Sequence, residues 1–193
     1  KDSKYASSKI NGERFIREIM TNATIIKPSL VYSVDDNLTT KFMSLLSVLP
    51  LFPLYYGGST KFTPIHVSEL AELIFYIISK EFYSKTIEAI GPEVLTFKEI
   101  LQILMKCIKK KRILLPLPLT LAKLSAFFLQ IFPEPLITKD QINLLKYDNI
   151  KTENGLTNFD IGCPSELKFE ETVNKYAYNW KEGGQFSNLL KMK

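Results

Sequence analysis

The sequence is poor in the residues that bind metals and form disulfides. It has one histidine, His66, and two cysteines, Cys107 and Cys163, which do not form a Cys-x-x-Cys pair. A structural zinc site needs four such ligands at short spacings, so no zinc site is expected. Two cysteines in unrelated contexts fit a reducing compartment. A lone histidine beside a predicted helix start is expected to make a structural hydrogen bond.

The chain also lacks a strong charge bias and a secretory signal. Lys and Arg number 25 against 20 Asp and Glu, a formal charge of +5. The basic residues are mostly lysines spread along the chain, and the aromatic residues are not interleaved with arginine as a nucleic-acid groove favours. Specific nucleic-acid binding is therefore not expected, and a basic module for membrane or nucleic-acid surfaces is an alternative that rests on charge alone.

What the sequence does have is apolar material and an alternation of strands and helices. Hydrophobic residues make up 46% of the chain, enough for a sizeable core. Apolar spacing predicts helices over residues 5–20, 36–49, 68–78 and 96–110, and strands over 23–27, 62–67 and 86–90. Expected helix caps are Asp2 or Ser3, Ser68, and a capping box of Thr96 and Glu99. This order predicts an α/β fold with parallel strands.

A second half of different character follows. Residues 113–132 are strongly apolar, but a helix over 118–132 would be about 22 Å long at 1.5 Å per residue. That length is short of the roughly 30 Å of a bilayer core, so the segment should not span a membrane. With the basic run 106–112, it could instead lie at a membrane surface or be buried in the core. Further helices are expected over 138–145, begun by Thr138 and Gln141, and over 169–180.

The chemistry-bearing candidates are Tyr5 and Lys9, which lie one helical turn apart. An ammonium beside a phenol stabilises the phenolate, so tyrosine can act as a general acid or base while lysine reaches a ribose hydroxyl. The same spacing occurs twice more, at Tyr76/Lys80 and Tyr147/Lys151. For those two pairs, packing of the tyrosine and a solvated lysine is the expected explanation.

Ordered motifs around the first pair resemble extended short-chain dehydrogenases/reductases, the epimerase/dehydratase superfamily. They are Tyr-Ala-Ser-Ser-Lys at 5–9, the segment Ala-Thr-Ile-Ile-Lys-Pro-Ser-Leu-Val-Tyr at 23–32, and His-Val-Ser-Glu-Leu-Ala at 66–71. Residues 91–99, 136–145, 148–149 and 183–186 look similar to bacterial relatives of the nucleotide-binding accessory subunit of respiratory complex I. That group is an atypical branch of the same superfamily.

The resemblance implies a bound NADP or NAD. By position, Tyr5 and Lys9 would contact the nicotinamide ribose. The nicotinamide ring would be lined by the backbone of Pro28, Ser29, Leu30 and Val31. The branch is thought to hold its dinucleotide without turnover, with complex I subunits as partners. Implied locations are the cytoplasm, or the inner membrane as a peripheral protein on the bacterial cytoplasmic or mitochondrial matrix side, with contact through residues 106–132.

The sequence also departs from the family pattern. Ser33 and Val34 follow Tyr32 where extended enzymes usually have Gly-Pro, and Glu69 replaces an aspartate. The glycine-rich turn that holds the pyrophosphate is absent. The chain is therefore interpreted as a C-terminal portion: residues 1–95 as half of a Rossmann-like NAD(P)-binding domain and 96–193 as a mainly helical cap.

Three functions follow from this interpretation. The preferred one is a dinucleotide-binding accessory or assembly subunit related to complex I. The first alternative is an NAD(P)-dependent epimerase, dehydratase or reductase that uses Tyr5 and Lys9. The second is the basic surface-binding module. The residues leave open whether turnover occurs.

Overall fold

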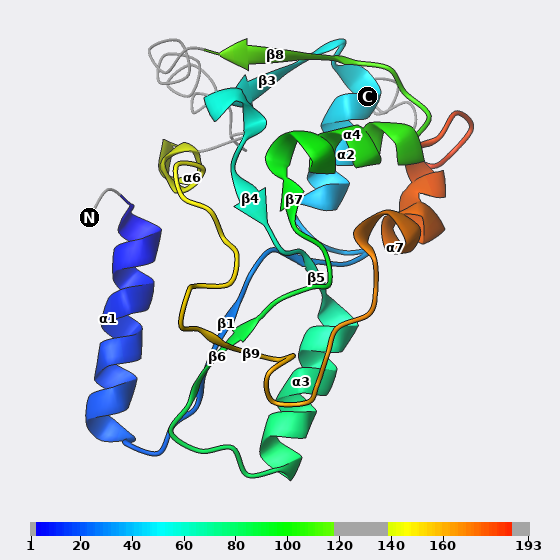
Figure 1. Ribbon diagram of the computed structural model, residues 1–193. Coiled ribbons are helices and arrows are strands. Elements are labelled where there is room, and N and C mark those ends of the chain that lie inside the picture. The colour runs from blue at the N-terminus through cyan, green and yellow to red at the C-terminus, as the bar shows by residue number, and fades with distance from the viewer. Residues whose placement is uncertain (1–2, 118–138, 187–193) are drawn as a thin grey trace.

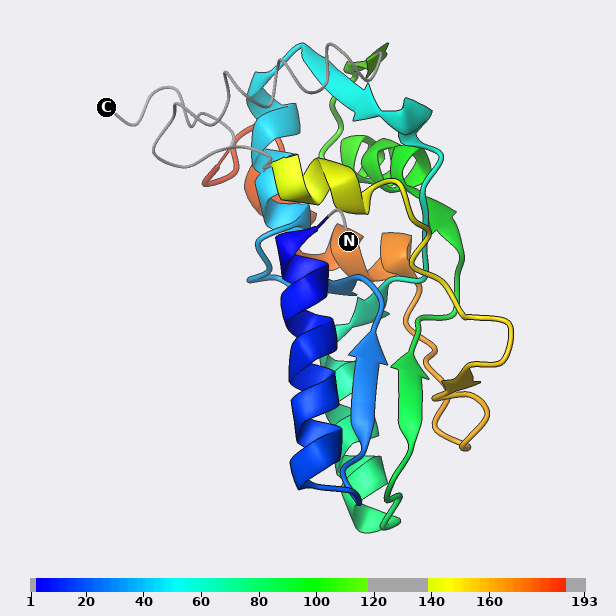
Figure 2. The same cartoon turned by 90° about the vertical axis from the view of Figure 1, so that its left-hand side faces the viewer.

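The computed structural model describes residues 3–117 and 139–186 and has the predicted α/β fold (Figure 1). Three parallel strands form a sheet in the order β1–β6–β9: β1 (Ile25–Pro28), β6 (Thr86–Ala89) and β9 (Leu156–Thr157). Helices α1 (Lys4–Ile19) and α3 (Val67–Ser79) lie on opposite sides of this sheet (Figures 1 and 2). The predicted helix and strand over residues 5–27 are therefore α1 and β1.

Helix α1 is packed lightly. Ser3 caps it, because its hydroxyl accepts a hydrogen bond from the Ala6 N–H at 3.1 Å. None of its residues is buried, and Ile10 and Ile19 expose 66% and 80% of their surface. The apolar stripe of α1 thus faces outward in this chain.

The larger core lies above the sheet in Figure 1 and joins segments from both halves of the chain. Its elements are α2 (Thr39–Val48), β3 (Leu51–Tyr55), α4 (Phe97–Cys107), α7 (Phe169–Tyr176) and the short 3-10 helix η2 (Ala177–Trp180). A smaller core packs α3 against the sheet through Ile65, Leu73, Ile77, Ile87 and Ala89. Because α2 packs with α4 across residue 95, the division of the chain at that residue stays a prediction.

Short strands connect the two cores. The stretch expected as one strand over 62–67 is two: β4 (Lys61–Phe62) pairs with β7 (Leu95–Thr96), and β5 (Ile65–His66) pairs with β2 (Val31–Tyr32). A 3-10 turn, η1 (Tyr56–Gly58), precedes them. The capping box of Thr96 and Glu99 starts α4, as predicted.

One local prediction was wrong, and one strand was not predicted. The cap of α3 is His66, whose ring nitrogen accepts the Ser68 N–H, and Ser68 itself lies within the helix. No element was predicted at the start of the apolar run, where β8 (Ile113–Leu117) pairs with β3 in parallel. Proline at 116 and the missing period of a helix favour an edge strand there. The expected helix over 118–132 and its neighbour Thr138 lie outside the described residues.

The remaining helices differ from prediction only at their ends. Helix α6 (Lys139–Leu144) lies within the expected 138–145, and α7 with η2 covers 169–180. Helix α4 ends at Cys107 rather than near residue 110, and α2 starts at Thr39. Across residues 3–117 and 139–186, no helix combines the length and apolar character required to cross a bilayer.

Candidate functional site

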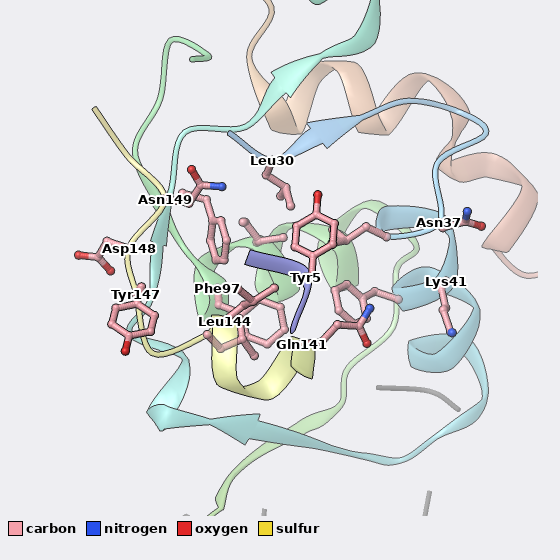
Figure 3. A pocket seen from close by; sticks show the side chains of 15 residues that line it. Tyr5, Leu30, Asn37, Lys41, Phe97, Gln141, Leu144, Tyr147, Asp148 and Asn149 are labelled. Atoms are coloured by element: carbon pink, nitrogen blue, oxygen red, sulfur yellow. The ribbon is translucent and has the colours of Figure 1, made fainter. Parts of the chain in front are cut away.

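A cavity of about 480 Å³ opens between the start of α1 and helices α2, α4 and α6 (Figure 3). Its apolar lining comes from Leu30, Leu38, Phe42, Phe62, Phe97, Ile100, Leu144 and Leu145. Its polar lining comes from Tyr5, Asn37, Lys41, Gln141, Tyr147, Asp148 and Asn149. The volume is in the range of small-molecule sites.

Tyr5 lines this cavity, and Lys9 lies beside Tyr5. The Lys9 ammonium is 5.5 Å from the centroid of the Tyr5 ring, within the range of a cation–π contact. Tyr5 lines the cavity and exposes 57% of its surface, and in Figure 3 its hydroxyl points to the side on which Leu30 lies. The structure thus brings the two side chains together, and their roles toward a dinucleotide stay predictions.

The two other Tyr/Lys pairs have structural contacts. The Tyr76 hydroxyl donates to the Ile161 carbonyl at 3.0 Å, and its ring stacks on Phe82. Lys151 pairs with Asp160 at 3.1 Å. Tyr147, however, lines the same cavity as Tyr5, a placement that its sequence context did not indicate.

Of the four residues expected beside the nicotinamide ring, Leu30 lines the cavity. Pro28 ends β1 and Val31 starts β2, and neither lines it. The buried Ser29 hydroxyl donates to the Asn149 carbonyl at 2.7 Å and accepts the Thr63 N–H at 3.1 Å. The end of β1 is thereby tied to the segment that carries Tyr147 and Asn149.

Asp140 was missed by sequence reasoning and fixes the start of α1. Its carboxylate accepts hydrogen bonds from the Ser3 hydroxyl at 2.9 Å and from the Lys4 and Tyr5 N–H groups at 3.0 and 3.1 Å. Desolvation raises the pKa of Asp140, but together these hydrogen bonds lower the pKa by more than desolvation raises it. The pKa of Asp140 is therefore below its ordinary value. A carboxylate at a helix N-terminus is also favoured by the helix dipole. Helix α6 therefore determines where Tyr5 sits.

His66 and Glu69 stabilise the start of α3 and the loop that precedes α7. His66 makes the structural contacts expected of a lone histidine: it caps α3 and packs edge-on against Tyr32, with ring centroids 5.2 Å apart. Burial lowers the pKa of His66, so its ring is neutral at pH 7 and can accept a hydrogen bond. Glu69 Oε1 accepts the N–H groups of Glu166 and Leu167. Glu69 thus anchors the loop that leads into α7.

Comparison with known proteins places this geometry in context. No protein-family model matches the chain. It is 29% identical over 194 residues to NADH dehydrogenase (ubiquinone) 1 alpha subcomplex subunit 9, mitochondrial, of Arabidopsis thaliana, covering 94% of this chain and 48% of that protein. The protein of the same name from Dictyostelium discoideum is 29% identical over 191 residues, covering 97% and 53%. The chain is a relative of these subunits.

A third relative, from the fungus Neurospora crassa, is named NADH-ubiquinone oxidoreductase 40 kDa subunit, mitochondrial. It is 24% identical and covers 86% of this chain and 44% of that protein. The chain spans about half the length of the curated relatives it matches.

Solved structures show the same fold. A UDP-glucuronic acid 4-epimerase of Bacillus cereus, in complex with UDP-glucuronic acid and NAD, superposes with a TM-score of 0.60 at 13% identity, over 90% of this chain and 52% of that one. A dTDP-4-dehydrorhamnose reductase of Bacillus anthracis, in complex with NADP, gives 0.62 at 17% identity, over 89% and 54%. The fold is that of the Rossmann-like extended short-chain dehydrogenases, as the motifs predicted.

Proposed function

We propose that the chain is part of an accessory or assembly subunit of respiratory complex I that holds a nicotinamide dinucleotide without turnover. The observation that carries this proposal is the similarity to three proteins named as complex I subunits, which extends over 86% to 97% of the chain. Fold alone would not separate such a subunit from an enzyme.

The cavity supports this proposal, because it could receive the nicotinamide end of the dinucleotide. The exposed phenol of Tyr5, with the Lys9 ammonium beside it, presents hydrogen-bonding groups for a ribose hydroxyl. Leu30, which follows β1, offers an apolar surface for the ring, and Pro28, Ser29 and Val31 belong to the same turn. The pyrophosphate would be held by the part that the relatives have beyond the matched region. These residues do not distinguish NAD from NADP, because the group that reads the ribose 2′ position belongs to that other part.

We also propose a peripheral contact with the inner membrane or with membrane subunits. The exposed side chains of Leu51, Ile113 and Leu115 lie on β3 and β8, next to the basic run. Two basic residues of that run make contacts within the chain. Lys106 pairs with Glu170, and Arg112 donates to the carbonyls of Leu46 and Ser47.

The exposed lysines 109 and 111 of this run lie just before β8 in the sequence. Such a combination of exposed apolar and cationic side chains suits an anionic membrane surface. The proposed location is the matrix side of the mitochondrial inner membrane or the cytoplasmic side of a bacterial one.

An enzyme is the rival function, because Tyr5, with Lys9 beside it, lines a cavity large enough for a substrate. The test uses the full-length protein, purified from membranes, in two measurements. We expect complex I subunits to co-purify with it, and we expect no hydride transfer to or from its nicotinamide. Turnover that Tyr5→Phe abolishes would contradict the accessory function and establish the enzymatic one.

A further inference from the structure

The motif Asp148–Asn149 is fixed to the strand ends next to the cavity. The Asp148 carboxylate accepts the Lys61 N–H at 2.8 Å, and the Asn149 N–H donates to the Lys61 carbonyl at 2.8 Å. The Asn149 carbonyl accepts hydrogen bonds from the buried Ser29 hydroxyl at 2.7 Å and from the Thr63 N–H at 3.3 Å. The backbone of Asn149 is therefore held between β4 and the residue that follows β1.

These contacts use the backbone of Asn149, whereas its side chain lines the cavity. No hydrogen bond joins the side-chain amide to residues 3–117 or 139–186, so its N–H groups and its carbonyl oxygen are both available to a ligand. In the view of Figure 3 the amide nitrogen is on the side of Leu30, and Leu30 lies between Asn149 and Tyr5. A side chain on so constrained a backbone loses little freedom on binding.

The position of this amide suits one group of the dinucleotide. Ligands of open α/β sheets bind outside the carboxyl ends of the strands, and Asn149 contacts the residue that follows β1. The proposed function puts the nicotinamide ring against Leu30. The carboxamide is the hydrogen-bonding substituent of that ring, with an amino group that donates and a carbonyl that accepts. A side-chain amide offers the complementary acceptor and donor, so the two amides can form a pair of hydrogen bonds.

We propose that Asn149 binds the carboxamide of the nicotinamide and thereby selects dinucleotides whose carboxamide is intact. In this arrangement Tyr5 contacts the ribose and Asn149 contacts the carboxamide, on either side of the surface that Leu30 offers to the ring. A site that hydrogen-bonds a ligand group discriminates against analogues that lack the group, which an apolar wall alone does not do. The inference rests on the proposed function, because it names the residue that recognises the base within the same dinucleotide site.

Binding is measured on the full-length protein, freed of endogenous dinucleotide, with four probes: NAD, NADP and the acetylpyridine analogue of each. In the analogues a methyl group replaces the amide nitrogen, so the ring keeps its acceptor and loses its donor. We expect the wild type to bind the natural dinucleotide that it prefers at least about fivefold more tightly than the matching analogue, the effect of one hydrogen bond.

Variants of Asn149 test whether this residue causes the discrimination. Asn149→Leu keeps the backbone contacts and nearly the size of the side chain. It should weaken the natural dinucleotide about tenfold and bind it and its analogue within about twofold of each other. Asn149→Ala, which removes the amide without adding an apolar group, should lose the discrimination in the same way. Asn22→Leu, at an exposed asparagine that does not line the cavity, is the matched control and should keep the wild-type ratio.

Melting temperatures show which variants are folded. A folded Asn149→Leu or Asn149→Ala variant that keeps the wild-type ratio would overturn the inference, as would a wild type that binds a natural dinucleotide and its analogue equally. Either result leaves the proposed function in place, because dinucleotide is still bound. A full-length protein that binds neither NAD nor NADP would contradict the proposed function itself, and the inference with it.

Discussion

Helix α1 and helix α4 form two sides of the same cavity and are held in opposite ways. None of the residues in α1 is buried, and its position depends on polar contacts such as those of Asp140 and the Glu13–Lys27 ion pair at 2.7 Å. In α4, Ile100 and Leu104 are fully buried in the larger core. The apolar wall of the site is therefore rigid, whereas the helix that carries Tyr5 depends on a few hydrogen bonds.

The contrast extends to the apolar side chains that α1 exposes. Helix α1 exposes several large apolar side chains, among them Ile10, Phe15 and Ile19, on more than one of its faces. The relatives are about twice as long as the matched region. We propose that the additional part covers α1 and thereby completes both the sheet and the dinucleotide site.

The largest expected effect separates the two helices directly. Ile100→Ala removes a fully buried side chain and should lower the free energy of unfolding by about 2–5 kcal/mol. Ile10→Ala, the matched change on α1, removes a side chain that is 66% exposed in this chain, and it should cost about 1 kcal/mol in the full-length protein, where the additional part is proposed to cover α1. Urea denaturation of both variants of the full-length protein measures the difference. A cost below about 0.5 kcal/mol for Ile10→Ala would contradict the proposal that the additional part covers α1.

A smaller effect is expected at Glu69, which is 9% exposed. Glu69→Ala leaves the N–H groups of Glu166 and Leu167 without their acceptor and should cost about 1–3 kcal/mol. Glu72→Ala, on the same helix but exposed, is the control and should be near neutral. Equal stabilities of the two variants in thermal denaturation would contradict the anchoring role of Glu69.

Next in size is the contact that positions Tyr5. The pKa of Asp140 is lowered in the folded protein, so its contribution is present above the ordinary carboxyl pKa of about 3.9 and is lost as pH falls through the folded value. We expect amide hydrogen exchange in the first turn of α1 to become several-fold faster in Asp140→Ala, while α4 is unchanged. Amides of α1 that exchange at the same rate in both proteins would show that α6 does not hold this helix.

The smallest effect is expected on the outer face of α1. The Arg14–Glu18 ion pair is exposed, with 64% and 59% of the two side chains accessible. Arg14→Gln should change the free energy of unfolding by less than about 0.5 kcal/mol because water screens such pairs. A larger loss in chemical denaturation would place a partner on this face.

Local patterns predicted the elements whose signals are local. The capping box before α4, the β-branched run of β1 and the Tyr5/Lys9 spacing all depend on residues within a few positions of one another. The order of strands and helices was enough to predict the α/β fold, and the motifs were enough to predict the similarity to complex I subunits.

The errors and omissions concern contacts between distant segments. Asp140 caps α1 from a position more than 130 residues away in the sequence, so no local pattern could predict this contact. Pairing of β8 with β3 is equally non-local, since an apolar run with prolines fits a strand or a helix until its partner is known. The choice of His66 over Ser68 as a cap depended on where the preceding strand ended.

The most direct test of the proposed dinucleotide site is the nicotinamide content of the full-length protein after gel filtration, read by absorbance and fluorescence. We predict stoichiometric dinucleotide in the wild type, a large loss in Lys9→Met, and no loss in Lys80→Met, which changes the lysine of an equally spaced pair on α3. A wild-type protein without nicotinamide, or equal retention in the two variants, would contradict the account.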